Sequence, residues 1–334
     1  MLDKSIKGSV VAMLAGFVAW VIAIAVTSGA GPVLETLIGG LLVGVLYSLV
    51  ALGVVLIFKA SGVFNFAQGA MVLFAALSLA RLSEMMPIWL ALICSIAIMV
   101  ALAYAIEFFV LRRLVNQEQI ILFMATLGIT YFLDGFGQTI WGSDIYKIDL
   151  GLPKNPVFLF EGVFPGGLLI DPADVIAAFV CALLVIALAL FFQYTRVGRA
   201  LRAVADDHQA AQSVGIPLNT IWLLVWTVAG IVALVAGMIW GNKLGVQFSL
   251  SLIALKALPV LILGGFTSIP GAIVGGLIIG AGEKLAEVVI GPKIIPLLDL
   301  AGGGIENWFA YVLALLFLLI RPQGLFGEKI IERI

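Results

Sequence analysis

Long apolar runs dominate this sequence, and each approaches the length that a helix needs to cross a lipid bilayer. The hydrocarbon core of a bilayer requires about 20 consecutive, mostly apolar residues in helical conformation. The pattern predicts an all-α, polytopic transmembrane helical bundle of about ten spans. The expected spans are residues 9–28, 36–58, 63–80, 88–110, 119–140, 174–194, 218–240, 253–267, 269–290 and 305–320.

The composition agrees with a membrane protein. Hydrophobic residues make up 63% of the 334 residues and charged residues only 11%, whereas a soluble domain has roughly 45–50% apolar and about 25% charged residues. No polar stretch is long enough to fold alone, so we expect residues 1–334 to form a single transmembrane domain. The net charge of −1 gives no reason to expect binding to nucleic acid.

The basic residues predict which side of the membrane each connection faces. With the N-terminus in the cytoplasm, eleven of the 18 lysines and arginines fall in inner connections and six in outer ones. Cytoplasmic loops carry the excess of basic residues in membrane proteins. We therefore expect a multi-pass protein of the cell inner membrane with both termini in the cytoplasm. The longest inner connection is then 195–217, and the longest outer one, rich in glycine and proline, is 141–173.

The usual sequence signatures of metal binding and ATP hydrolysis are absent. The one histidine, His208, and the two distant cysteines, Cys94 and Cys181, do not have the spacing of a metal site. No Gly-x-x-x-x-Gly-Lys-Ser/Thr segment occurs, so the chain has no phosphate-binding loop of its own. We expect no cofactor and no enzymatic activity. If ATP drives transport, another subunit must hydrolyse it.

Charged residues inside the expected spans are few. The candidates are Asp134, Glu107, Glu283 and Lys284, and such residues are functional suspects because charge is costly in hydrocarbon. They do not form a chain of acidic groups like a proton relay, which counts against a proton-driven carrier.

Two amide side chains stand out in the segment Gly62–Ala70. Asn65 and Gln68 lie three residues apart within an apolar context. Buried amides must find hydrogen-bond partners, so they mark either contacts between helices or a polar path. Both interpretations stay open at the level of sequence.

A second glycine-marked break, Gly264–Pro270, weakly echoes the first. An apolar helix end precedes each break, and a Gly-Ala pair follows it. Transporters often carry such repeats, with interrupted segments near the substrate path, although apolar helices also share residues by chance. Irregular backbone at membrane depth survives only where protein or a water-filled cavity covers it. We predict that Asn65, Gln68 and Ser268 line or border a translocation path.

The inner connection is expected to contain a compact, capped helix. Residues 199–214 can form it, Gly215 can end it, and Pro217 prevents its continuation. Small residues at Ala210 and Ala211 would let another protein approach its surface closely. A plain basic cytoplasmic loop is the alternative interpretation.

Charged side chains are also spaced along this expected helix. Arg199 and Arg202 are three residues apart and share a face, and Asp206 follows Arg202 by four residues. That spacing places Arg202 and Asp206 next to each other on a helix surface.

Taken together, these segments resemble the permease subunit of the branched-chain amino acid ABC importers, the high-affinity Leu/Ile/Val uptake type. Gln209-Ala210-Ala211, followed after three residues by Gly215, is similar to the Glu-Ala-Ala-x-x-x-Gly loop of bacterial ABC permeases, with Gln in place of Glu. The segment Asn65–Gly69 resembles the family's Asn-Phe-Ala-(His/Gln)-Gly signature, and Arg321–Gly327 resembles its C-terminal signature. The matches are spread over residues 36–327.

The resemblance implies an importer that also needs ATP-binding subunits, a second homologous permease subunit, an extracytoplasmic substrate-binding protein and membrane lipid. It further implies that the inner helix is a coupling helix, seated in a cleft of the ATPase. The residues expected at that contact are Arg199, Arg202, Asp206, Gln209, Ala210, Ala211 and Gly215. The implied substrate is a branched-chain amino acid, another amino acid or a related small polar solute. A self-sufficient secondary transporter, a channel or a membrane scaffold is the alternative.

Overall fold

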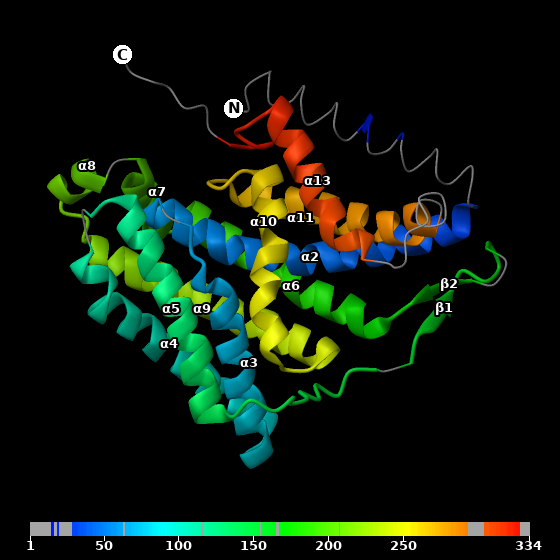
Figure 1. Cartoon of the computed structure of the whole chain (residues 1–334), viewed down its shortest axis with the longest axis horizontal. Coiled ribbons are helices and arrows are strands. Elements are labelled where there is room, and N and C mark those ends of the chain that lie inside the picture. Colours follow the sequence, from blue (N-terminus) through cyan, green and yellow to red (C-terminus); the bar gives the residue numbers. More distant parts are fainter. Residues whose placement is uncertain are drawn as a thin grey trace. The chain divides into compact units, whose positions relative to one another are not determined.

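The computed structural model is almost entirely helical (Figure 1). It describes residues 15–16, 19, 29–62, 64–114, 117–153, 155–164, 167–206, 208–292 and 304–327. The predicted first span, 9–28, lies outside the described residues except at positions 15, 16 and 19.

A helix stands at each of the other nine predicted spans. These are α2 (Ala30–Ser61), α3 (Ala67–Met85), α4 (Ile88–Phe109), α5 (Gln119–Trp141), α6 (Pro172–Tyr194), α9 (Leu218–Leu244), α10 (Ile253–Gly264), α11 (Ile269–Leu285) and α13 (Ile305–Ile320). Shorter elements connect them, namely η1 (Leu111–Arg113), β1 (Val157–Leu159), β2 (Leu168–Ile170), α7 (Arg196–Asp206), α8 (His208–Ser213), η2 (Phe248–Leu252) and the π-helical η3 (Ala286–Ile290). The all-α, polytopic fold class is confirmed.

Length and apolarity divide these helices into groups. In the described chain six helices are long and apolar enough to cross a membrane. They cover Gly31–Ser61, Ile88–Arg113, Gln119–Trp141, Pro172–Tyr194, Leu218–Leu244 and Ile269–Val288. Phe248–Gly264 and Trp308–Ile320 are apolar but shorter. Helix α3 is in neither group, and it carries Gln68, Arg81 and Glu84 within its 19 residues. The total of ten spans stays a prediction.

The chain divides into two compact units. The first unit comprises Met1–Ser48, Leu152–Val180 and Leu258–Ile334, and the second comprises Leu49–Gly151 and Cys181–Ala257. Helices α2, α6 and α10 each contribute residues to both units.

Helix α3 is the centre of the second unit. It packs against α4, α5, α9 and η2, and α4 also packs against α9 (Figure 1). Every residue from Ala67 to Ala80 is buried, so this helix is apolar on all sides where it is covered by its neighbours. Gly237 of α9 lies so close to α3 that an added Cβ would stand 2.6 Å from the Val72 carbonyl oxygen.

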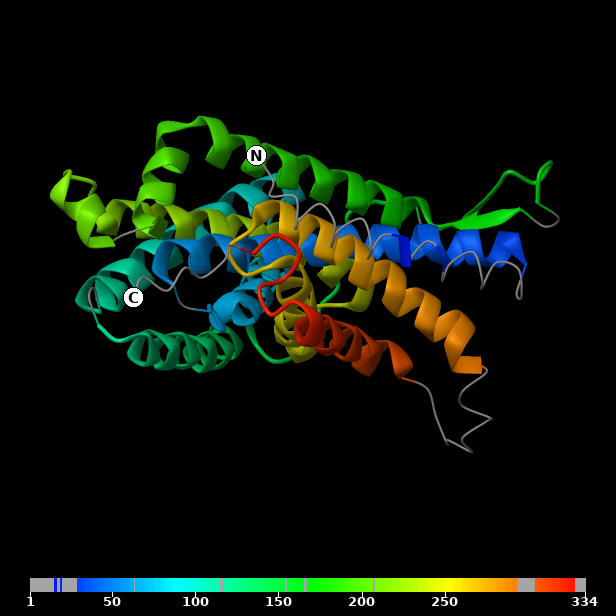
Figure 2. The same ribbon diagram turned by 90° about the horizontal axis from the view of Figure 1, so that it is seen from above.

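In the first unit, α2 and α11 cross through glycines. A Cβ added to Gly280 would lie 2.5 Å from the carbonyl oxygen of Gly40 and from the Cα of Gly44. Ser48 Oγ donates a hydrogen bond to the Ile273 carbonyl at 3.2 Å across the same contact. Small residues let backbones approach this closely in membrane proteins. Helix α13 packs along α11 in the same unit (Figure 2).

The long connection 141–173 contains short ordered pieces. Strands β1 and β2 pair antiparallel with Val157 opposite Ile170, and the hairpin extends beyond the start of α6 (Figure 2). The backbone N–H of Leu169 donates to Glu35 Oε2 at 3.0 Å, which attaches the hairpin to the first turns of α2.

Candidate functional site

The two amides singled out in the sequence form one buried polar node in the second unit. Asn65 and Gln68 are both fully buried, at 0% exposure. Asn65 Nδ2 donates to Gln68 Oε1 at 3.4 Å, and Gln68 Nε2 donates to the Ala229 carbonyl of α9 at 3.3 Å. Asn65 Oδ1 accepts from the N–H of Ala67, the first residue of α3, at 3.0 Å.

Two backbone carbonyls at the break between α2 and α3 accept hydrogen bonds from side chains of neighbouring helices. The Trp222 indole N–H donates to the Ala60 carbonyl at 3.1 Å, and Thr126 Oγ1 donates to the Phe64 carbonyl at 3.3 Å. Phe66 packs edge-on against Phe64 and Phe123. Exposed carbonyls at membrane depth cost free energy unless protein groups pair with them. The irregular segment is therefore held in place by α5 and α9.

Two glycines make room for this node: Gly69, which belongs to the signature segment, and Gly53, which the sequence analysis did not single out. A Cβ on Gly53 of α2 would stand 2.6 Å from Gln68 Nε2. A Cβ on Gly69 would overlap the carbonyl oxygen of Ser251 in η2. Only glycine lets these groups approach so closely. Nothing in the sequence around Gly53 indicates that it lies against Gln68.

Ser268 belongs to the first unit, at the turn between α10 and α11. It is the N-cap of α11, and its Oγ accepts a hydrogen bond from the Gly271 N–H at 3.0 Å. Proline follows at the start of the helix, which is a favourable position because its missing N–H would be unpaired there.

The turns of the two units have the same local design. Gly62 and Gly265 both have positive φ, 71° and 104°, a conformation natural only to glycine. Their N–H groups donate four residues back, to the Phe58 carbonyl at 2.7 Å and the Leu261 carbonyl at 2.8 Å. Asn65 and Ser268 each follow their glycine by three positions, but Asn65 accepts from the N–H two residues further on, whereas Ser268, the N-cap of α11, accepts from the N–H three residues further on. The two turns thus share a left-handed glycine with the same backbone hydrogen bond, and an internal repeat stays a prediction.

The C-terminal signature segment is part of the second of these turns. The N–H groups of Leu325 and Phe326 donate to the carbonyls of Leu263 and Gly264 at 2.7 and 3.1 Å. A Cβ on Gly324 would lie 2.7 Å from the Gly265 nitrogen. The end of α10 is therefore capped by residues some sixty positions later in the chain, a contact that the sequence analysis missed.

Two helices lie in the connection 195–217, where one helix over residues 199–214 was predicted. Helix α7 covers Arg196–Asp206 and α8 covers His208–Ser213, and position 207 between them lies outside the described residues. The predicted stop is confirmed: Gly215 has φ +85°. The Ile216 N–H donates to the Ala211 carbonyl and the Gly215 N–H to the Gln212 carbonyl, both at 3.0 Å. This pair of bonds is the Schellman arrangement that ends many helices.

The basic residues of α7 hold its corner with α6. Arg202 donates to the carbonyls of Phe192 and Gln193 at 2.8 and 3.3 Å, and Arg199 donates to the Tyr194 carbonyl at 3.4 Å. Cationic side chains stabilise the unpaired carbonyls at a helix C-terminus. The helix is amphipathic, with Gly198, Leu201 and Val204 buried. The bend between α6 and α7 is thus fixed from within the chain.

The expected small-residue surface is only half right. Ala210 is exposed, but Ala211 is buried, at 2% exposure. Adjacent residues of a helix are about 100° apart around its axis, so one of the two can face the protein while the other faces away from it. Asp206 and Gly215 are exposed, and of Gln209 only the backbone is described.

Of the four charged residues within the expected spans, three have a partner side chain: Glu107, Glu283, and Lys284, whose Nζ lies 2.6 Å from Glu287 Oε2. Glu107, at 1% exposure, accepts two hydrogen bonds from Arg112 at 3.0 and 3.1 Å. Glu283 accepts from the Tyr47 hydroxyl at 3.2 Å. Asp134 Oδ1 is buried and has no hydrogen-bond partner among the described residues. The described part of the chain holds no group of three metal-ligating side chains.

Comparison with known proteins places these features in one family. The sequence profile described as "Branched-chain amino acid transport system / permease component" matches residues 36–321. The chain is 30% identical over 313 residues to the high-affinity branched-chain amino acid transport system permease protein BraD of Pseudomonas aeruginosa, covering 90% of this chain and 98% of BraD.

Two further relatives are similar over most of their length. The corresponding protein LivH of Escherichia coli (strain K12) is 28% identical over 319 residues, covering 90% of this chain and 97% of LivH. The probable branched-chain amino acid transport permease protein LivH of Methanocaldococcus jannaschii is 29% identical over 305 residues, covering 86% and 91%.

Proposed function

The chain belongs to the branched-chain amino acid transport permease family, and from this premise we propose that it is the membrane-spanning permease subunit of an ATP-driven importer. The observation that carries the proposal is the family match over residues 36–321, which includes all six candidate spans except the beginning of the first. The chain has no phosphate-binding loop of its own, so the energy has to come from partner subunits.

The proposed complex contains ATP-binding subunits, a second homologous permease and an extracytoplasmic substrate-binding protein. Its substrate is a branched-chain amino acid, another amino acid or a related small polar solute. The secondary-transporter alternative is disfavoured because two of the carboxylates in the spans, Glu107 and Glu283, already accept hydrogen bonds from neighbouring side chains.

Purification of the tagged chain from its native membrane tests this function. We expect an ATP-binding subunit to co-purify in stoichiometric amount, and leucine uptake by the reconstituted complex to require ATP and survive collapse of ion gradients. Uptake by the chain alone, driven by a proton or sodium gradient, would instead establish the secondary transporter.

We propose that α7, α8 and the Gly215 stop together form the ATPase-docking segment. One reason is the similarity of Gln209–Gly215 to the family's loop. A second is that hydrogen bonds from Arg202 and Arg199 to carbonyls at the end of α6 hold the segment in place. Exposed residues available to a partner are Ala210, Asp206 and Gly215.

We propose that Asn65, Gln68 and Ser268 border the translocation path. The support is their position at two glycine-marked breaks, one in each unit, each with a glycine at positive φ. Interrupted helices of this kind accompany substrate sites in many transporters.

We propose that both termini and residues 195–217 face the cytoplasm, within one transmembrane domain in the inner membrane. After replacement of Cys94 and Cys181 with alanine, single cysteines at His208→Cys and Phe160→Cys should react with a membrane-impermeant maleimide from opposite sides. Phe160 is an exposed residue of the outer hairpin, so it offers an accessible probe. Labelling of both positions from the same side would overturn this topology.

A further inference from the structure

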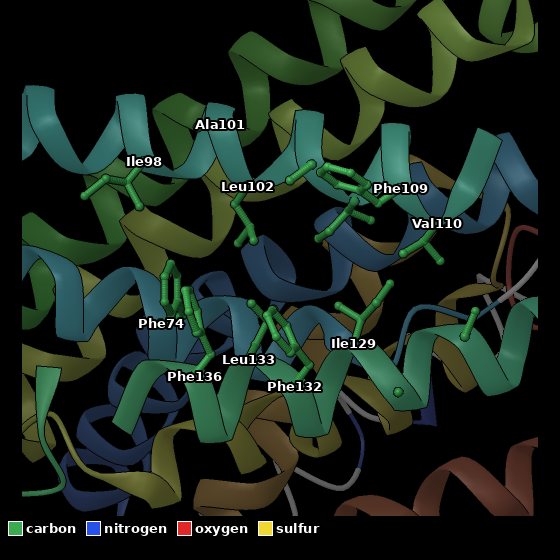
Figure 3. A pocket seen from close by; sticks show the side chains of 14 residues that line it. Phe74, Ile98, Ala101, Leu102, Phe109, Val110, Ile129, Phe132, Leu133 and Phe136 are labelled. Atoms are coloured by element: carbon green, nitrogen blue, oxygen red, sulfur yellow. The ribbon is translucent and has the colours of Figure 1, made fainter. Parts of the chain in front are cut away.

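An apolar groove lies between α4 and α5, with α3 as its floor, entirely within the second unit (Figure 3). Its volume is about 740 Å³. Leu102 and Phe109 project from α4, and Ile129, Phe132 and Phe136 project from α5 (Figure 3). Phe74 of α3 stacks on Phe136, with ring centroids 6.2 Å apart.

The chemistry of the lining restricts what can occupy the groove. All fourteen lining residues are Phe, Ile, Leu, Val, Ala or Gly. A zwitterionic amino acid would leave its ammonium and carboxylate groups without partners there, at a high desolvation cost. The occupant must therefore be apolar where it contacts the groove.

The position of the groove indicates a hydrocarbon chain. Both walls, α4 and α5, belong to candidate membrane spans, and only 22% and 28% of their apolar stretches are buried inside the protein. Lining residues run along α4 from Ile98 to Val110, which corresponds to about 18 Å at 1.5 Å per residue. A bilayer core is about 30 Å thick, so the groove is about as long as one leaflet is deep.

Two arginines follow in the sequence directly after the lining residues at one end of the groove. Val110 is succeeded by η1, which contains Arg112 and Arg113. Arg112 is already neutralised by its two hydrogen bonds to Glu107. Arg113 is exposed and makes no ion pair within the described part of the chain. One arginine charge is thus available to an anion at the mouth of an apolar groove.

We propose that this groove binds an acyl chain of an anionic phospholipid whose phosphate pairs with Arg113. Basic residues next to membrane spans attract anionic lipid headgroups, and the groove adds an apolar surface matched to the chain. The lipid would fill the gap between α4 and α5, which both pack on α3.

Two glycines of α5 give a matched pair of variants. Gly128 lines the groove, and a Cβ there meets no atom within 4 Å. Gly135 lies on the same helix with equally open surroundings, but it does not line the groove. Gly128→Phe therefore fills the groove without displacing backbone, whereas Gly135→Phe adds the same side chain elsewhere on α5.

Native mass spectrometry of the purified full-length protein in its complex, titrated with phosphatidylglycerol or phosphatidylcholine, tests the site. We expect preferential retention of phosphatidylglycerol, its loss in Gly128→Phe, and wild-type retention in Gly135→Phe. Arg113→Gln should lower phosphatidylglycerol retention about fivefold and leave phosphatidylcholine retention unchanged.

Three results would overturn the proposal. One is equal retention of the two lipids by the wild-type protein, and another is equal phosphatidylglycerol retention by the two glycine variants. The third is efficient cross-linking of Gly128→Cys to a second permease subunit, which would show that protein occupies the groove.

Discussion

Replacement of Gln68 with alanine should lower solute uptake about tenfold or more while the complex still assembles. The Gln68 amide accepts from Asn65 and donates to the Ala229 carbonyl in a fully buried site. Truncation leaves the buried Asn65 amide N–H without its acceptor and removes a bond between α3 and α9; an unpaired buried polar group costs about 1–3 kcal/mol. The break between α2 and α3 would then rearrange at the proposed path. ATP-dependent leucine uptake by proteoliposomes measures the effect, and co-purification of partner subunits measures assembly.

Gly53→Ala tests the same node without removing the amide. Its Cβ would stand 2.6 Å from Gln68 Nε2, so the amide must move. Uptake should therefore fall, as in Gln68→Ala. Ser78→Ala is the control, because Ser78 is equally buried on α3 but donates only to the Phe74 carbonyl of its own helix at 2.8 Å. Normal uptake by Asn65→Ala, Gln68→Ala and Ser268→Ala would leave these residues a packing role only.

The helices were predictable because hydrophobic length is a local property. Every described helix longer than 15 residues coincides with a predicted apolar run, since a span must satisfy its own backbone within about 20 residues. The stop at Gly215 was equally local, because a positive φ favours glycine. Within the predicted helix 199–214, α7 ends at Asp206 and α8 begins at His208, and position 207 between them lies outside the described residues.

Contacts between distant segments were not predictable from the sequence. Nothing near Leu325 indicates that its N–H caps the carbonyl of Leu263. The sequence around Gly40 also does not indicate which helix packs against it, since many helices contain small residues. The structure shows that Gly280 of α11 lies against Gly40. The sequence also did not indicate that the Arg202 guanidinium donates to a carbonyl at the end of α6; its predicted contact with a partner protein stays a prediction. Each case depends on which segments meet, and this is decided by packing of the whole unit.

The burial of Ala211 changes how the docking segment must be probed. A bulky residue at Ala211, which is 2% exposed, would overpack the interior of this chain itself. Loss of ATPase binding in such a variant would then report misfolding rather than a blocked interface. Ala210 is exposed, so a large side chain there points away from the chain's own core.

We therefore expect Ala210→Trp to leave membrane levels near normal and to lower ATPase co-purification and substrate-stimulated hydrolysis about tenfold or more. Well-packed interfaces are as dense as protein interiors, and an indole at their centre holds the partner surfaces apart. The Schellman bonds at Gly215 and the Arg202 contacts with α6 do not involve the Ala210 side chain, so the segment keeps its shape.

Val163→Trp is the matched control for the size of the insertion. Val163 is 71% exposed in the outer connection, where the proposed topology allows no contact with an ATPase, so its variant should bind and stimulate the ATPase normally. A plain cytoplasmic loop would accept the Ala210 indole as readily as the outer connection accepts one at Val163. Equal ATPase association and equal stimulated hydrolysis in both variants would exclude the exposed face of α8 from coupling, even if Ala211→Trp abolished both.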